Sequence, residues 1–292
     1  MNVIVVGSVN MDLVFTGLSA LPLPGETISG RDFVVMPGGK GANQASAAAT
    51  LGATVQFVAA VGTDAFGTQA SDDLANRGVG LAHLKRVDAA TGVAAVLIDD
   101  SGENSIIIAP GANAHVAAAD AREIAATVDG AAVVLACLEV PVATIVEWSR
   151  IAKERSWTFI LNPAPAQPLP AELLANTTIL TPNETELAVL GSVESLHNAG
   201  VDTVIVTRGG DGASLYRAGE PEHLQPAYDV RPVDTTGAGD AFNGALATSI
   251  AAGATIEDAL AFAAAVGAMA TTALGARAAL PTREQVDAYR GE

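Results

Sequence analysis

The chain has 292 residues, half of them apolar, and a formal net charge of −17. This length suffices for one large α/β domain or two small ones, and the acidic balance disfavours binding to nucleic acid or to an anionic membrane. The single cysteine, Cys137, lies in an apolar run, so we expect a small buried thiol and no internal disulfide. The first apolar run has no basic segment before it and no stretch suits a membrane span, so we expect a cytoplasmic protein without a signal peptide.

The first third of the chain alternates short apolar runs with helical segments closed by glycine. Runs rich in β-branched residues predict strands at 2–6, 12–16, 28–35, 54–61, 83–87, 93–99 and 105–109. Alanine-rich or amphipathic segments predict helices from about residue 40 to Gly52 and over 65–76. Two insertions, about 12–36 and 90–109, break the strand–helix rhythm, so we expect them to form a small separate sheet.

From residue 117 onward, helices and strands alternate. We expect strands at 132–136, 158–161, 178–180 and 203–206, and helices at 143–154, 184–190 and 193–199. A late antiparallel edge strand is expected at 213–216, then helices after Gly239, over 256–273 and over 283–290. The alanine runs 47–49, 117–119 and 263–265 are expected inside helices. The alternation predicts one α/β domain over 1–292, with a mostly parallel central sheet covered on both faces.

The small sheet is expected to serve as a lid. Its apolar residues, at 97–98 and 106–108, would point to both of its faces because side chains alternate along a strand. One face can cover a site in the main domain, and the other needs a partner. A second copy of the chain is the simplest partner. We therefore predict a lid that also forms the contact of a homodimer.

The stretch 233–246 carries the strongest chemical signal. Two threonines and two glycines lead into an apolar helical pattern that begins near Gly239. The first amides of such a helix lack intrahelical partners and carry partial positive charge, so they favour an anion. Asp240 stands in the first turn, where a carboxylate can take a proton from an attacking hydroxyl while the amides hold the transferred group. The alternative is an ordinary first-turn aspartate that complements the helix dipole.

Other polar clusters follow the predicted strands. In open α/β sheets, ligands bind beyond the carboxyl ends of the strands. The clusters expected at that edge are Asn10 with Asp12, Gly38 to Asn43, Glu139, Asn162, Asn183 with Glu186, Thr207 to Gly210, and the stretch around Asp240. Their number at one edge predicts a binding site there.

Several of these residues have simpler explanations. Asn10 and Asp12 are suited to bind sugar hydroxyls but are also common turn formers. Lys40 lies among glycines at a helix start, where it can bind a ligand or remain an ordinary surface lysine. Asn183 and Glu186 have the spacing of a capping box, and the alternative places them near a hydrated Mg²⁺ on nucleotide phosphates. The four histidines show no metal-binding spacing.

The combined motifs resemble the PfkB family of carbohydrate kinases, and within it the ribokinases. The motifs that carry the resemblance are Asn10-Met11-Asp12, the segment 37–45 with Gly38-Gly39-Lys40-Gly41, Leu138-Glu139-Val140-Pro141, Asn162-Pro163-Ala164-Pro165, the segment 181–186, and Asp234 to Asp240. They occur in the family's order from the first strand to the last helices. The resemblance implies a ribokinase-like three-layer α/β sandwich with a β-sheet lid, and ATP-dependent phosphorylation of D-ribose at its 5-hydroxyl.

The resemblance also implies a role for each matching residue. Asp240 would be the base, and the backbone of Gly237, Ala238 and Gly239 the anion hole. The residues implied to hold the sugar are Asn10, Asp12, Gly38, Gly39, Lys40, Asn43 and Glu139, with Asp240. Those implied along the nucleotide are Asn162, Asn183, Glu186, Thr207, Gly209 and Gly212, and Asn183 and Glu186 would support Mg²⁺, Glu186 through water.

A monovalent cation, usually K⁺, is implied beside the anion hole. Asp234 and Thr236 match its site, and further carbonyl ligands are expected around Thr272 and Gly275. The family often has a serine ligand where this chain has Ala279. One oxygen is therefore missing, and water would have to replace it.

Three functions remain open from the sequence. The first is a ribose kinase, and the second is a related kinase for another sugar or a nucleoside. A nucleoside pocket should offer aromatic faces, and the lid offers mainly Phe15 and Phe33. The third is a non-catalytic sugar-binding protein, which would not need a base such as Asp240 at an anion hole.

Overall fold

The computed structural model of the chain describes residues 2–101, 104–130 and 132–291, and residues 102 and 103 of the second lid insertion lie outside it. A nine-stranded sheet in the order β13-β12-β11-β10-β9-β8-β1-β4-β5 forms the body. Its strands are β1 (Asn2–Val6), β4 (Thr54–Gly62), β5 (Leu84–Val87), β8 (Ala132–Cys137), β9 (Thr158–Asn162), β10 (Ile179–Leu180), β11 (Thr203–Thr207), β12 (Ala213–Arg217) and β13 (His223–Gln225). The strands from β11 to β5 are parallel, and β12 and β13 are antiparallel.

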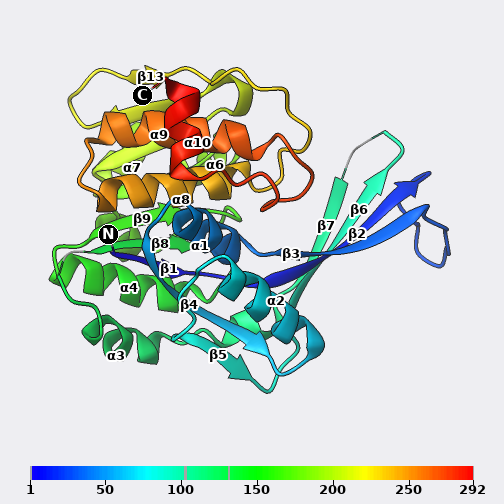
Figure 1. The fold of residues 1–292 in the computed structure, drawn as a ribbon. Helices are drawn as coiled ribbons and strands as arrows, with labels where there is room; N and C mark the ends of the chain where they lie inside the picture. The colour runs from blue at the N-terminus through cyan, green and yellow to red at the C-terminus, as the bar shows by residue number, and fades with distance from the viewer. Residues whose placement is uncertain (1, 102–103, 131, 292) are drawn as a thin grey trace.

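Helices cover both faces of this sheet (Figure 1). One layer holds α1 (Lys40–Thr50), α2 (Ala65–Asn76), α8 (Ala238–Ala251), α9 (Ile256–Ala270) and α10 (Arg283–Arg290). The other holds α3 (Ala121–Ala126), α4 (Val142–Glu154), α5 (Ala171–Ala175), α6 (Glu184–Leu190) and α7 (Val193–Asn198). None of the helices in the described ranges is both long and apolar enough to cross a membrane.

Strand β1 shows why the sequences of the central strands are continuously apolar. Val3 and Val5 pack into the core beneath α1 and α8, whereas Ile4 and Val6 pack into the core beneath α3 and α4. Side chains alternate along a strand, so a strand covered on both faces needs apolar residues at every position. The four side chains are completely buried. The run 2–6 therefore fixes β1 at the centre of a three-layer sandwich.

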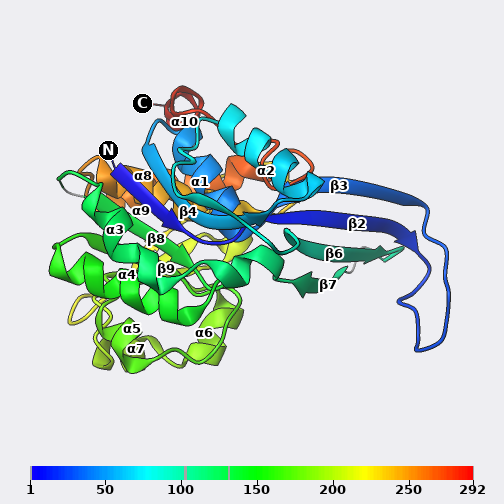
Figure 2. The ribbon, with the colours of Figure 1, turned by 90° about the horizontal axis from the view of Figure 1, so that it is seen from below.

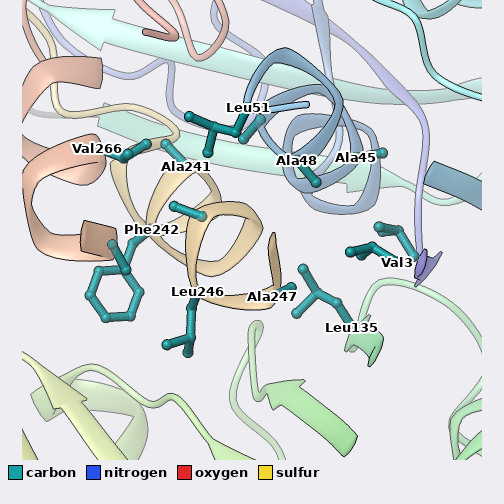
Figure 3. Close-up of a cluster of buried hydrophobic side chains, with 14 of the residues drawn as sticks. Val3, Ala45, Ala48, Leu51, Leu135, Ala241, Phe242, Leu246, Ala247 and Val266 are labelled. Atoms are coloured by element: carbon teal, nitrogen blue, oxygen red, sulfur yellow. The ribbon is translucent and has the colours of Figure 1, made fainter. Parts of the chain in front are cut away.

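Helix α8 packs tightly between α1 and α9 (Figure 3). Ala241, Phe242 and Leu246 of α8 face the same cluster as Ala48 of α1 (Figure 3). A Cβ at Gly244 would lie 2.6 Å from the Gln44 carbonyl oxygen and 2.7 Å from the Ala47 Cβ. Only glycine permits this approach, because real Cβ contacts are longer. The close contact sets the distance between the two helices that carry Asp240 and Asn43.

The lid is a four-stranded sheet in the order β3-β2-β6-β7 that projects from the body (Figure 2). Its strands are β2 (Asn10–Leu18), β3 (Asp32–Gly38), β6 (Gly92–Asp99) and β7 (Asn104–Ala109). The outer pairs are antiparallel and the central pair, β2 with β6, is parallel. The two predicted insertions thus form one separate sheet, whose inner strands begin directly after the body loops at Val9 and Thr91.

Several predicted elements differ from the structure. The strand expected from residue 28 begins at Asp32, and the run 117–119 precedes α3 in a short 3₁₀ turn, since three alanines are too few to nucleate an α-helix. The helix expected to reach residue 273 ends at Ala270, where the Thr271 carbonyl oxygen accepts from the amides of Val233 and Asp234 instead. The strand at 213–216 is antiparallel, but β13 lies outside it at the edge.

Candidate active site

Asp240 lies in the first turn of α8, is only 7% exposed, and faces α1. Its Oδ2 accepts from Asn43 Nδ2 at 2.9 Å, and its Oδ1 accepts from Gln44 Nε2 at 3.1 Å. Burial raises the pKa of Asp240, while the charge of Lys40 and the Asn43 amide oppose that rise. The structure therefore fixes a buried carboxylate between two amide donors, with a pKa that makes it a better proton acceptor.

The N-terminus of α8 offers backbone amides beside this carboxylate. Gly237 is the N-cap and has a φ of 77°, a left-handed conformation that glycine adopts without strain. The Ala238 amide donates to the Thr235 carbonyl oxygen at 3.2 Å, and the first amide of the helical ladder, that of Ala241, donates to Gly237 at 2.8 Å. The Gly239 and Asp240 amides lie between these two and precede the helical ladder. They are the best-placed donors for an anion, and the Ala238 amide is already used in this structure.

A cavity of about 230 Å³ opens beside Asp240 and the start of α8. Its lining combines groups from five loops: Lys40, Asn162, Ala164, Thr181, Asn183, Glu186, Thr207, Thr235, Gly237, Gly239, Asp240 and Asn243. Three of these segments follow the neighbouring parallel strands β9, β10 and β11, so their residues converge at one sheet edge, as predicted. Lys40 follows the lid strand β3, and the residues from Thr235 to Asn243 lie at the start of α8. The cavity is polar and lies where an anionic group would meet both Lys40 and the α8 amides.

A larger cavity of about 590 Å³ adjoins it and shares Thr207, Thr235 and Gly239 with it. Its walls are mainly apolar and include Tyr228, Phe242 and Ala264, and also Gly209 and Gly212. An apolar cavity that leads into a polar one suits a ligand with a flat apolar part and an anionic part. Thr207, Gly209 and Gly212 thus lie together, as the sequence predicted.

The groups predicted to hold the sugar gather on the α1 side of Asp240. Glu139 Oε2 accepts from the Lys40 amide at 3.0 Å and also from the Ser8 hydroxyl. Burial lowers the pKa of Lys40, but the negative charges of Asp240 and Glu139 outweigh it and leave the pKa raised. Lys40 is half-buried and lines the polar cavity, and the charges of Asp240 and Glu139 favour its ammonium form.

Asn10 and Asp12 stand at the root of the lid, on β2. Asn113 Nδ2 donates to Asn10 Oδ1 at 2.7 Å. The same Nδ2 donates to the Val9 carbonyl oxygen, and Asn113 Oδ1 accepts from the Val9 amide, so Asn10 is held in place. The Asp12 carboxylate lies against Gly38, since a Cβ there would approach Asp12 Oδ2 to 2.2 Å. Burial raises the Asp12 pKa to about 6, although Arg277 opposes this. Both residues lie in a strand and their side chains have fixed partners, so they do not act as turn formers.

Asn183 and Glu186 do form the capping box that was one of their two interpretations. Glu186 N donates to Asn183 Oδ1 and Asn183 N donates to Glu186 Oε2, each at 2.8 Å. Both residues nevertheless line the polar cavity, so the cap does not remove them from it. In the described part of the chain there is no group of three or more His, Cys, Asp or Glu side chains that could hold a metal ion by themselves. A Mg²⁺ here would need phosphate or water oxygens as its other ligands.

The loops predicted to hold a monovalent cation are joined through Asp234. Its Oδ1 accepts from the Thr236 amide at 2.9 Å and its Oδ2 from the Gly275 amide at 2.8 Å. The Thr272 hydroxyl donates to the Met269 carbonyl oxygen. A carboxylate and backbone carbonyls suit a hard cation, and each Asp234 oxygen keeps a further lone pair. A monovalent cation here would be held by Asp234 and by backbone carbonyl oxygens, without a side-chain oxygen from Ala279.

Three residues without a predicted role belong to this network in the structure. Gln44 bridges Asp240 and Asn162, Asn113 holds Asn10, and Arg277 donates to Asn43. Gln44 lies within the motif segment 37–45, and Arg277 is a single positively charged residue in an apolar segment. These were the available signals, but neither indicates which distant residue the side chain meets.

Comparisons with known proteins show the family and the fold. Residues 1–283 match the family described as pfkB family carbohydrate kinase. A ribokinase of Bacillus subtilis is 39% identical over 98% of this chain and 98% of its own length. The crystal structure of a Thermotoga maritima ribokinase has a TM-score of 0.89 at 33% identity, covering 100% of this chain and 99% of that one. A structure of Arabidopsis thaliana ribokinase complexed with ribose and ATP has a TM-score of 0.89 at 34% identity, covering 99% and 97%. This chain belongs to the pfkB family of carbohydrate kinases.

Proposed function

We propose that the chain is an ATP-dependent kinase that phosphorylates the 5-hydroxyl of D-ribose. The observation that carries the proposal is the buried Asp240 carboxylate beside the Gly239 and Asp240 amides of α8, in a polar cavity that adjoins a larger apolar one. Support comes from relatives named ribokinase at more than 30% identity over nearly the whole chain. A related structure contains both ribose and ATP.

The sugar would bind between α1 and the lid root. Its hydroxyl groups would be held by the side chains and backbone of Asn10, Asp12, Gly38, Gly39, Lys40, Asn43 and Glu139. Carboxylates and amides at fixed positions can accept and donate hydrogen bonds to several hydroxyls at once. This arrangement would place the 5-hydroxyl of the sugar near Asp240.

In the proposed reaction, the 5-hydroxyl oxygen attacks the γ-phosphorus of ATP. Its proton passes to the Asp240 carboxylate as the new P–O bond forms, and the bond to the β-phosphate oxygen breaks to release ADP. The Gly239 and Asp240 amides, with the α8 dipole, stabilise negative charge on the transferred group. Lys40 lines the same cavity and adds a positive charge there.

The nucleotide would occupy the two adjoining cavities. Its base and ribose fit the apolar cavity next to Gly209 and Gly212, and its phosphates pass Thr207 toward Asn162, Asn183 and Glu186. Mg²⁺ would be held by Glu186 and Asn183 through water, and would neutralise phosphate charge. A monovalent cation would be held by Asp234, Thr236 and the backbone near Thr272 and Gly275, and would strengthen the field at the anion site.

The lid would form the contact of a homodimer. Phe33, Val34, Ile106, Ile107 and Ile108 on its outer strands are 45–64% exposed. An apolar surface of this kind is covered in most proteins, and a second lid presents the same surface. Sedimentation velocity tests this directly, and a monomer at concentrations of full activity would overturn it. A cytoplasmic location stays a prediction.

A coupled assay for ADP release tests the function with ribose, deoxyribose, fructose and adenosine as acceptors. The proposal expects the highest kcat/KM with ribose and stoichiometric ribose 5-phosphate as the product. Preference for another sugar or for adenosine would favour the related-kinase alternative. Ribose binding by calorimetry without turnover of any acceptor would favour a sugar-binding protein.

A further inference from the structure

Arg277 lies in the loop between α9 and α10 and is 5% exposed. Its three guanidinium nitrogens each donate one hydrogen bond. Nε donates to Asn43 Oδ1 at 2.7 Å, Nη1 to Asp73 Oδ2 at 2.6 Å, and Nη2 to the Gly38 carbonyl oxygen at 2.7 Å. Because the guanidinium is planar and rigid, three acceptors in different directions hold it in one orientation.

The bond to Asn43 determines which way that amide faces. With Oδ1 accepting from Arg277, Nδ2 is left to donate to Asp240 Oδ2 at 2.9 Å. A reversed amide would put its oxygen against the Asp240 carboxylate and its NH₂ group against the guanidinium, and both contacts are repulsive. Arg277 therefore makes Asn43 a donor to Asp240.

The bond to Gly38 acts on the other half of the site. Gly38 is the last residue of β3, where the lid strand enters the body, and the Asp12 carboxylate packs against it. A guanidinium that holds the Gly38 carbonyl oxygen fixes the start of the segment 38–43. One side chain thus connects the lid root with the carboxylate of α8.

Arg77 provides a natural comparison next to Arg277. Its Nε donates to Asp73 Oδ1 at 3.1 Å, and its Nη1 donates to the Arg277 carbonyl oxygen at 3.2 Å. Arg77 thus supports the same loop and shares the same carboxylate. Its described hydrogen bonds go to that carboxylate and that carbonyl oxygen, away from Asn43 and Gly38.

We propose that Arg277 is a positioning residue for phosphoryl transfer, which orients Asn43 toward Asp240 and holds Gly38 at the root of the lid. The inference rests on the proposed function, because it assigns the effect to the step in which Asp240 accepts the sugar proton. Its role is geometric, because the three guanidinium nitrogens bond to acceptors in different directions. A single positive charge at the same place cannot make these bonds together.

The test compares Arg277→Lys and Arg277→Met with Arg77→Met as the control. Lysine keeps the charge but cannot hold Asn43 and Gly38 together, so we expect kcat with ribose to fall about ten- to a hundredfold in both Arg277 variants. The KM for ATP should change less than about threefold, since Arg277 does not line the nucleotide cavities. Arg77→Met should keep kcat within about twofold. Thermal melting and the stoichiometry of ribose binding measure the folded fraction of each variant, so that kcat is compared per folded molecule.

A double-mutant cycle with Asn43→Ala separates positioning from general support of the fold. Once Asn43 is truncated, Arg277→Met should reduce kcat by less than about threefold further, because the orientation of Asn43 no longer contributes and only the bond to Gly38 remains to be lost. Full kcat in Arg277→Lys, or effects of Arg277→Met and Asn43→Ala that multiply, would overturn the inference. Failure of the unaltered chain to phosphorylate ribose would instead overturn the proposed function. The cycle would then be measured with the acceptor that is turned over, or by calorimetric acceptor affinity if none is.

Discussion

Helices α1 and α8 and the lid strands β2 and β3 hold site residues in two different ways. Asp240 and Asn43 lie in a layer that is packed on all sides, where Gly244 lets the two helices touch. Asn10 and Asp12 lie at the root of a sheet that projects from the body (Figure 2). This sheet exposes large apolar side chains. The packed layer gives the carboxylate a fixed environment, whereas the proposed sugar-binding groups Asn10 and Asp12 lie where the projecting sheet joins the body. Changes in the first region should alter chemistry and stability, and changes in the second should alter binding and assembly.

The largest effect is expected at the buried carboxylate. Asp240→Asn keeps the size of the side chain but removes the proton acceptor, and it keeps only one of the two hydrogen bonds accepted from Asn43 and Gln44. We expect kcat to fall by about two to four decades, the usual contribution of a positioned base, while ribose affinity stays near that of the unaltered chain. Steady-state kinetics and calorimetry measure the two quantities, with Asp72→Asn on the exposed surface of α2 as the control. Unchanged turnover would remove Asp240 from its role.

The next largest effect is on stability in the packed layer. Leu246 is completely buried in α8, whereas Leu224 in β13 is 55% exposed. Leu246→Ala should lower the free energy of unfolding by about 2–5 kcal/mol through lost burial and a cavity. The same substitution at Leu224 should change it by less than about 0.5 kcal/mol. Urea unfolding compares the two, and equal losses would show that the layer is not the stable part of the molecule.

The lid root should show a pH-dependent stability. Burial raises the pKa of Asp12 from its ordinary value of 3.8 to about 6, so the folded state favours the protonated carboxyl. Its contribution to stability is fully present below the unfolded-state pKa and is lost as the pH rises to about 6. Asp12→Asn removes this loss, so the variant should gain up to about 3 kcal/mol relative to the unaltered chain between pH 3.8 and pH 6. Denaturation at a series of pH values measures the difference, and a constant difference would contradict the shift.

The smallest effect on folding is expected on the outer lid. Ile107 of β7 is 64% exposed, so Ile107→Lys should change the free energy of unfolding of one subunit by less than about 0.5 kcal/mol. The same change should weaken the dimer, because it places a charge in the apolar contact. Sedimentation equilibrium gives the dissociation constant, with Val189→Lys on α6, 55% exposed, as the control. A dimer unaffected by Ile107→Lys would move the contact elsewhere.

Much of the framework followed from local patterns. The run 2–6 is apolar at every position because both faces of β1 are covered, and that property is visible in the sequence. The α8 start was predicted near Gly239 and lies at Ala238, since the glycines and the apolar spacing act within one helical turn. Boundaries that depend on distant partners were missed, such as the end of α9, where Thr271 pairs with Val233 and Asp234.

The sequence by itself determined the order of strands and helices, the insertion of the lid and the residues at the carboxyl edge of the sheet. These depend on side-chain periodicity, chain breakers and the polarity of short loops, all of which are local. Only the tertiary structure decided that Arg277 meets Asn43 and Gly38, and that Gln44 shares Asp240 with Asn43. The physical reason is that a buried polar side chain bonds to whatever the packing of other layers brings to it. Residues 43 and 277 become neighbours only when α1, α8 and the loop after α9 have packed together.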